Sequence, residues 1–204
     1  MATSVTLVLF DMEGVLTHYD RAVRVERLSK LTGQPDAMIR HAIWDSGLEA
    51  RSDAGEIGDD AYLDALSGML AHRVTRDEWL ISRRASITPN RDVIALAERV
   101  AKRRRIAVLT NNGTLVTDHM DYLNPAVAEL FGSHIYGTAM FGATKPAPQA
   151  YLGCLDKLGV RPHETLFIDD SDANVTGAID AGLLAYKFVS ADALARELDR
   201  LALI

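Results

Sequence analysis

Five short apolar runs, rich in β-branched residues, limit most strongly what this chain can fold into. They lie at residues 5–10, 106–109, 134–136, 166–168 and 185–189. After the first run, the runs alternate with segments of helical periodicity, at residues 93–102, 149–158, 175–181 and 191–201, and Gly182 can stop the third of these helices. Strands that are apolar throughout and alternate with helices indicate a parallel sheet covered on both faces. We therefore expect an α/β fold.

A long stretch between the first two runs, about residues 17–88, has no convincing strand and carries helix signals instead. Pro35 can occupy the first turn of a helix that has Met38, Ile39, Ala42 and Ile43 on one face. A second apolar face contains Tyr62, Leu66, Met69 and Leu70. Thr75 and Glu78 match a capping box at the start of a third helix. We interpret this stretch as a helical insertion.

The composition favours a globular protein that binds a small ligand. Of 204 residues, 48% are hydrophobic and 25% are charged, and the net charge of -6 argues against nucleic acid as a partner. The single cysteine, Cys154, cannot form an internal disulfide. The apolar run at residues 5–10 is interrupted by Asp11, so we expect neither a signal peptide nor a membrane span, and a cytoplasmic location. The oligomeric state is left open.

Polar side chains follow three of the five runs directly. The first run leads into Asp11-Met12-Glu13-Gly14, the second into Thr110-Asn111-Asn112-Gly113, and the fourth into Asp169-Asp170-Ser171-Asp172. Lys145 follows the third run at a greater distance. Ligands of open parallel sheets bind at the carboxyl ends of the strands, so we expect these groups to converge on one edge.

This set of residues suits phosphoryl transfer. A carboxylate beside a phosphate requires cations to offset the repulsion, and Lys145 with a divalent ion would supply them. Asp11 would then be an ionised nucleophile, and Asp11 with Asp170 would form an oxygen-only site for Mg²⁺. Thr110 would help to hold the phosphoryl oxygens. Glu13 would protonate the leaving alkoxide and later activate water.

At these segments the chain resembles the haloacid dehalogenase-like (HAD) hydrolases. The matching segments, in order, are Phe10-Asp11-Met12-Glu13-Gly14-Val15-Leu16-Thr17, Val108-Leu109-Thr110-Asn111, Lys145-Pro146, and Phe167-Ile168-Asp169-Asp170 followed by Asn174. The resemblance implies a Rossmann-like core over residues 1–16 and 88–204, with a helical cap at 17–87. It also implies a phosphatase that acts on small phosphate monoesters, with sugar phosphates and nucleotides as the expected classes.

The same resemblance implies a role for each matching residue. Asp11 would be the nucleophile, and Mg²⁺ would be held by Asp11, the backbone carbonyl of Glu13 and Asp170, with support from Asp169. Lys145 would act in catalysis and, with Thr110, bind the transferred phosphoryl group. Asn111 would lie beside that group.

Glu13 departs from the family pattern, because phosphatases of this family usually have aspartate there. The extra methylene displaces the carboxyl group by about 1.5 Å, and a misplacement of about 1 Å can reduce a rate roughly 100-fold. Slow turnover, or a pseudoenzyme that only binds a phosphometabolite, therefore stays an alternative. Two further alternatives are a phosphomutase, if water is kept from the acyl phosphate, and a 2-haloacid dehalogenase, which the acidic pair Asp169 and Asp170 disfavours.

A phosphate-accepting receiver module also places aspartates, a threonine and a lysine at strand ends. Its acidic pair follows the first strand and its phosphorylated aspartate follows a later one, whereas here the expected nucleophile comes first.

Within the insertion, the candidates for contact with the leaving group are His41, Trp44, Arg51, Trp79 and Arg83.

Overall fold

A five-stranded parallel sheet forms the centre of the protein. The structure is a computed structural model that describes residues 5–204. The strand order is β5 (Ile135–Gly137), β4 (Arg105–Thr110), β1 (Leu7–Phe10), β6 (Thr165–Asp169) and β7 (Leu184–Lys187). In the register of the central strand, Leu7 lies opposite Arg105 on one side and Thr165 on the other. The predicted parallel α/β fold is confirmed, and its polar strand ends lie at one edge.

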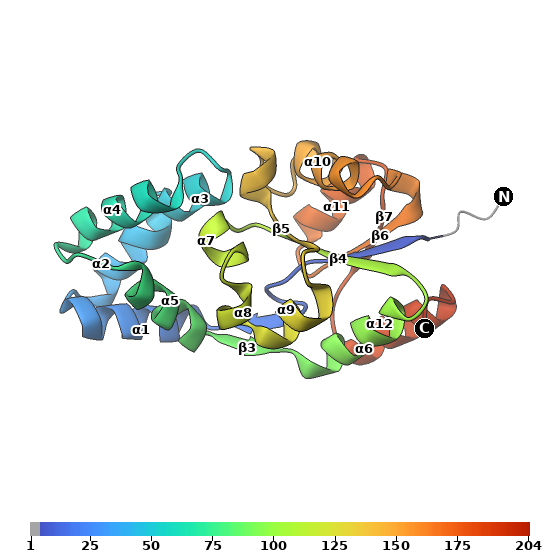
Figure 1. Ribbon diagram of the computed structural model, residues 1–204, viewed down its shortest axis with the longest axis horizontal. Helices are drawn as coiled ribbons and strands as arrows, with labels where there is room; N and C mark the ends of the chain where they lie inside the picture. The colour runs from blue at the N-terminus through green and yellow to red at the C-terminus, as the bar shows by residue number, and fades with distance from the viewer. Residues whose placement is uncertain (1–4) are drawn as a thin grey trace.

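Helices cover both faces of this sheet (Figure 1). On one face lie α10 (Pro148–Leu158) and α11 (Asp172–Asp180), and on the other lie α6 (Arg91–Ala101), α9 (Pro125–Phe131) and α12 (Ala191–Arg200). Leu7 and Leu9 of β1 belong to the apolar cluster of the first face, and Val8 and Phe10 belong to that of the second. This alternation explains why the strand is apolar at every position, since both of its faces are buried.

The connections between the core elements contain short helices that the sequence pattern did not predict. After β4 come α7 (Thr114–Thr117) and α8 (Met120–Leu123), and two 3₁₀ turns lie at Thr138–Phe141 and Pro162–Glu164. Helices of four residues contain too few periodic positions to be recognised from the sequence. Within residues 5–204, no helix combines the length and apolar character needed to cross a membrane.

The helical insertion, defined here as residues 20–86, lies beyond the carboxyl ends of the strands (Figure 1). It contains α1 (Arg21–Thr32), α2 (Asp36–Arg40), a π-helical turn (His41–Asp45), α3 (Leu48–Asp53), α4 (Asp59–Leu70) and α5 (Arg76–Ala85). Two strands connect it to the core, because β2 (Thr17–Tyr19) pairs antiparallel with β3 (Ile87–Pro89). The expectation that residues 17–88 lack strands was wrong. Each strand has only three residues and its partner is distant in the sequence, so no local alternation reveals it.

The insertion has its own buried apolar face, which was predicted only in part. The capping box of Thr75 and Glu78 at the start of α5 is confirmed. Met38 and Met69, which were expected on buried faces, are each 40% exposed. A π-helical turn contains more residues than an α-helical turn. The π-helical turn after α2 therefore shifts the residues that follow relative to Met38, and regular α-helical spacing from Met38 does not identify the buried positions.

A pair of glycine substitutions tests how closely α11 packs on the loop that carries Lys145. A Cβ on Gly177 would lie 2.4 Å from the Pro146 carbonyl oxygen, whereas Gly68 in α4 has no atom within 4 Å of its Cβ position. We expect Gly68→Ala to stabilise the protein by about 0.5–1 kcal/mol, since alanine favours helix. Gly177→Ala should destabilise it by at least about 1 kcal/mol. Urea unfolding measures both, and equal stabilisation would contradict this packing.

Candidate active site

The ammonium group of Lys145 joins three strand ends. Its Nζ donates hydrogen bonds to Asp11 Oδ1 at 2.7 Å, Asp169 Oδ2 at 2.9 Å and the Leu109 carbonyl oxygen at 3.0 Å. The lysine is 3% exposed, and these bonds use all three of its donors. The carboxyl ends of β1, β4 and β6 are therefore held around one buried cation.

Burial and charge act against each other on this group. Burial lowers the pKa of Lys145, but the carboxylates of Asp11 and Asp169 outweigh that effect and hold it above its ordinary value. Burial raises the pKa of Asp11 to about 7, although the adjacent Lys145 opposes the rise. Lys145 therefore remains a cation, and the ionised form of Asp11 depends on positive charge next to it.

Two asparagines fix the orientation of this cluster. The side-chain amide of Asn111 donates to the Lys145 carbonyl oxygen at 3.0 Å, and its Oδ1 accepts from the Lys145 backbone N–H at 2.9 Å. The side chain of Asn174 donates to both oxygens of Asp169, at 3.1 and 3.0 Å, and the Ser171 N–H donates to Oδ1 at 2.8 Å. Asn111 therefore holds the loop of Lys145, and its predicted contact with a phosphoryl group stays a prediction.

Three carboxylates form a group that could hold a metal ion. One oxygen from each of Asp11, Asp169 and Asp170 lies within 4.8 Å of the others. Both oxygens of Asp169 already accept hydrogen bonds, so the better-placed ligands are Asp170 and the second oxygen of Asp11. Gly14 permits the close approach of Asp170, because a Cβ there would lie 2.3 Å from Asp170 Oδ2. Carboxylate oxygens at this spacing suit Mg²⁺.

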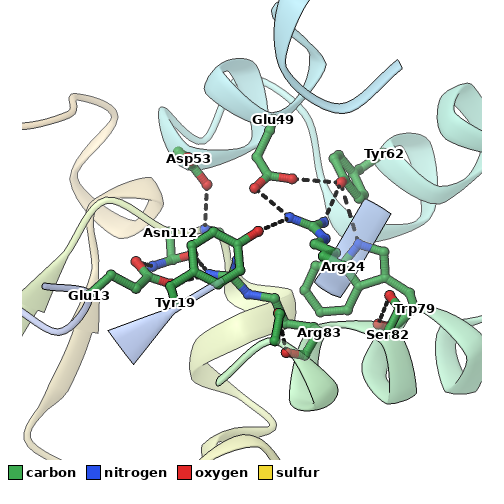
Figure 2. A network of polar contacts seen from close by, with 12 residues as sticks. Glu13, Tyr19, Arg24, Glu49, Asp53, Tyr62, Trp79, Ser82, Arg83 and Asn112 are labelled. Atoms are coloured by element: carbon green, nitrogen blue, oxygen red, sulfur yellow. Dashed lines mark hydrogen bonds and ion pairs between the residues drawn. The ribbon is translucent and has the colours of Figure 1, made fainter. Parts of the chain in front are cut away.

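Glu13 does not point free into solvent but is held by two donors (Figure 2). Arg83 of α5 forms an ion pair with Glu13 Oε1, and the side-chain amide of Asn112 donates to Oε2 at 2.9 Å. Asn112 also donates to Thr110 Oγ1 at 2.7 Å and accepts from Arg83 Nη2 at 3.0 Å. Thr110, Asn112 and Glu13 are thus one connected network, and the insertion contributes its cation.

Arg83 is only 2% exposed, and its donors are not all used. The Nε and Nη1 atoms have no acceptor within residues 5–204. A buried donor without a partner costs about 1–3 kcal/mol. The guanidinium carbon lies 4.1 Å from the centre of the Tyr19 ring, which favours the charged group through a cation–π contact.

A second buried cation organises the inside of the insertion. Arg24 of α1 forms a 2.8 Å ion pair with Glu49 of α3 and donates to the hydroxyl groups of Tyr19 and Tyr62 (Figure 2). Tyr62 in turn donates to Glu49 at 2.9 Å and accepts from the Trp79 indole at 3.3 Å. Because the ion pair and its hydroxyl partners come from different helices, the network fixes the arrangement of α1, α3, α4 and α5.

Asp53, at the end of α3, joins the insertion to the core. Its Oδ1 accepts from the Gly113 N–H at 3.1 Å, and its carbonyl oxygen accepts from the Thr138 hydroxyl at 2.9 Å. Burial, followed by the nearby charge of Glu49, raises the pKa of Asp53 to about 8. The contact between insertion and core is therefore made mainly with a neutral Asp53 at pH 7.

The five insertion residues predicted to reach the leaving group have different positions. Trp44 and Arg83 line a cavity of about 300 Å³ that also contains Glu13 and Asn112. Trp79 is buried inside the insertion, 3% exposed. His41 and Arg51 are exposed. Sequence reasoning placed Asn112 in the polar group at the sheet edge without giving it a role, and it missed Asp53 and Arg24. The Asn-Asn pair after β4 was the one local signal for Asn112, and nothing local marks the other two.

The pH dependence of stability tests the state of Asp53. A carboxyl group with a raised pKa in the folded protein contributes full stability below its unfolded pKa of about 4. That contribution is lost as the pH rises through the folded value of about 8. Asp53→Asn keeps the acceptor and removes the titration. We therefore expect the free energy of unfolding of Asp53→Asn, minus that of the parent protein, to increase by at least about 1 kcal/mol between pH 5 and pH 8. Denaturant unfolding at each pH measures this, with Asp156→Asn at an exposed position as control. A pH-independent difference would contradict it.

A second glycine pair tests the approach of Asp170. Gly14 and Gly33 both have positive φ, 91° and 72°, but a Cβ on Gly33 would meet no atom within 4 Å. Gly33→Ala should cost only backbone strain of about 1 kcal/mol. We expect Gly14→Ala to carry the same strain and also to weaken Mg²⁺ binding at least about tenfold, because the new Cβ displaces the Asp170 carboxylate. A loss of about 1.4 kcal/mol in the free energy of Mg²⁺ binding is enough for a tenfold change. Titration calorimetry with Mg²⁺ measures this, and unchanged affinity in Gly14→Ala would argue against a metal ligand at Asp170.

Known proteins resemble the chain in sequence and in fold. A family profile described as haloacid dehalogenase-like hydrolase matches residues 5–182. Phosphatase MT3486 of Mycobacterium tuberculosis is 32% identical over 90% of this chain and 87% of its own length. A predicted HAD-like family hydrolase from Porphyromonas gingivalis has a TM-score of 0.81 at 22% identity and covers 97% of this chain and 98% of its own.

A HAD family enzyme from Bacteroides thetaiotaomicron, solved with magnesium and inorganic phosphate, has a TM-score of 0.76 at 20% identity over 90% of this chain and 94% of its own. At such identities the two solved structures show the fold, whereas the profile and the mycobacterial relative show the family. The relatives also support the predicted enzyme class, a phosphatase. The chain belongs to the haloacid dehalogenase-like hydrolase family.

Proposed function

We propose that this protein is a magnesium-dependent phosphatase that hydrolyses small phosphate monoesters through an aspartyl phosphate on Asp11. The observation that carries the proposal is the buried Lys145, 2.7 Å from Asp11 and 2.9 Å from Asp169, with Asp170 in the same acidic group. A carboxylate that must approach a phosphate needs such a fixed positive charge beside it. The mycobacterial relative named as a phosphatase gives independent support.

The donor set fits a magnesium ion. Asp11, Asp170 and the backbone carbonyl of Glu13 would hold it, and Asp169 would support the site through Lys145, because both of its oxygens are engaged. Bound magnesium supplies charge neutralisation at the nucleophile and at the phosphoryl oxygens. The structural relative solved with magnesium and inorganic phosphate is consistent with this assignment.

The residues of the chain would act in two steps. In the first, a carboxylate oxygen of Asp11 attacks phosphorus, the bond to the ester oxygen breaks, and the leaving alkoxide takes a proton from Glu13. In the second, Glu13 takes a proton from water, whose oxygen attacks phosphorus and releases phosphate and Asp11. Thr110 and Lys145 would bind the phosphoryl oxygens in both steps, with Lys145 exchanging one of its three present acceptors for a phosphoryl oxygen.

The helical insertion, extended by residues 17–19 and 87, would act as the cap of the site. We propose the division into a core of residues 1–16 and 88–204 and a cap of residues 17–87, with the paired β2 and β3 as their connection. Arg83 and Asp53 of the insertion contact Glu13 and Gly113 of the core, so the cap would exclude water and contact the leaving group. Sugar phosphates and nucleotides remain the expected substrate classes. The group of three acids disfavours dehalogenation.

Phosphate release from a set of metabolite esters, with and without Mg²⁺, tests the function. We expect turnover that requires Mg²⁺ and that falls at least about 1,000-fold in Asp11→Asn, because the nucleophile is lost. Asp180→Asn, at an exposed position on α11, should keep the parent activity. Full activity of Asp11→Asn would refute the assignment of the nucleophile.

Glu13→Asp tests whether the longer side chain is an adapted part of the site. The glutamate reaches both Arg83 and Asn112. A side chain shorter by about 1.5 Å would lose these partners, so we expect kcat to fall about tenfold to 100-fold. Faster turnover in Glu13→Asp would indicate instead that the extra methylene limits the rate.

A further inference from the structure

The exposed face of α5 has a charge at each end and an apolar side chain between them. Asp77, Ile81 and Arg84 are all exposed residues of this helix. Their spacing of four and then three residues places them in one stripe along the helix, with about 10 Å between the first and the last. Ile81 is 53% exposed, although its neighbours Leu80 and Ser82 are buried. The stripe therefore presents an acid, an isoleucine and a base to solvent, in that order.

A hollow beside Ile81 extends this stripe onto the core. The hollow has a volume of about 240 Å³ and is lined by Asp77, Leu80, Ile81 and Tyr122. Tyr122, which is 41% exposed, belongs to α8, and α8 lies against α5 (Figure 1). An apolar hollow that has charged groups at its rim is typical of a protein–protein contact.

The charges at the two ends of the stripe are available to a partner. Neither Asp77 nor Arg84 forms an ion pair with another side chain within residues 5–204. Arg84 is nevertheless held in place, because it donates to the Tyr122 carbonyl oxygen and its guanidinium carbon lies 5.1 Å from the centre of the Tyr122 ring. An arginine has five N–H donors, so most of them remain for a carboxylate. The surface therefore offers a positioned cation at one end and a carboxylate at the other.

We propose that a second copy of this chain covers the surface formed by Asp77, Ile81, Arg84 and Tyr122, with the two α5 helices antiparallel about a twofold axis. In an antiparallel pair centred between residues 80 and 81, Asp77 of each copy lies beside the partner's Arg84. Ile81 of each copy then lies at the centre of the contact. The order of acid, isoleucine and base makes the stripe complementary to itself in this arrangement, whereas parallel helices would place like charges together.

We expect this contact to be reversible. Its area should lie at the small end of specific interfaces, which bury about 1,200–2,000 Å² in total. A Kd of about 1–100 µM is therefore expected. Because Ile81 belongs to the insertion and Tyr122 belongs to the core, each copy would contact both parts of its partner. The association does not require the phosphatase function, so either can fail without the other.

Sedimentation velocity over a range of concentrations tests for the dimer. We expect the parent protein to change from monomer to dimer between about 1 and 100 µM. Ile81→Glu should weaken association at least about 100-fold, because the twofold axis would bury two carboxylates at the centre. Met69→Glu, at an exposed apolar position on α4, should dimerise like the parent. A parent protein that is still monomeric at about 200 µM, or a dimer that Ile81→Glu leaves intact, would overturn the proposal.

Charge reversal tests the antiparallel arrangement. Asp77→Arg or Arg84→Asp alone would place like charges together at both ends of the helix pair, so we expect each to weaken association at least about tenfold. The double variant restores opposite charges and should recover most of the parent affinity. Helix stability cannot explain this recovery, because each reversal opposes the helix dipole and the double variant contains both. Circular dichroism checks that every variant is folded. No recovery in the double variant would overturn the antiparallel pairing.

Discussion

The ammonium group of Lys145, buried between the carboxylates of Asp11 and Asp169, is the interaction on which the rest of the site depends. Three desolvated charges contribute little net stability, because the cost of removing them from water offsets their attraction. These charges matter because they fix the positions of the groups around them. The lysine holds the ends of β1, β4 and β6 together, so the acids around it face one point in space. Asn111 and Asn174 then fix the orientation of the lysine loop and of Asp169.

The sheet and the gathering of three acids at its edge were predictable because their signals are local. Asp11, Asp169 and Asp170 follow buried strands directly, and parallel strands bring their carboxyl ends to one edge. The ion pair of Arg83 with Glu13 joins residues 70 positions apart, so only tertiary packing reveals it. The three-residue strands β2 and β3 were missed for the same reason. The raised pKa of Asp53 likewise depends on burial that no sequence pattern encodes.

The insertion does more than lie over the strand ends, because its Arg83 forms an ion pair with Glu13. Arg24 and its partners make its helices one unit, and that unit presents Arg83 to Glu13. Gly55 marks how closely it approaches the core, since a Cβ there would lie 2.3 Å from the Ala139 carbonyl oxygen. Movement of the insertion would therefore change the surroundings of Glu13 directly. This coupling gives a physical reason for a glutamate in place of aspartate, because the longer side chain reaches a cation on the insertion.

Location of the covalent phosphoryl group tests the central claim most directly. The parent protein is mixed with Mg²⁺ and an ester that it hydrolyses, and the reaction is quenched in acid during turnover. Treatment with borohydride then reduces an aspartyl phosphate to homoserine. Peptide mass spectrometry then finds the altered residue. The account predicts homoserine at position 11 and at no other aspartate. Turnover with residue 11 unaltered, or with the change at Asp169 or Asp170, would contradict it.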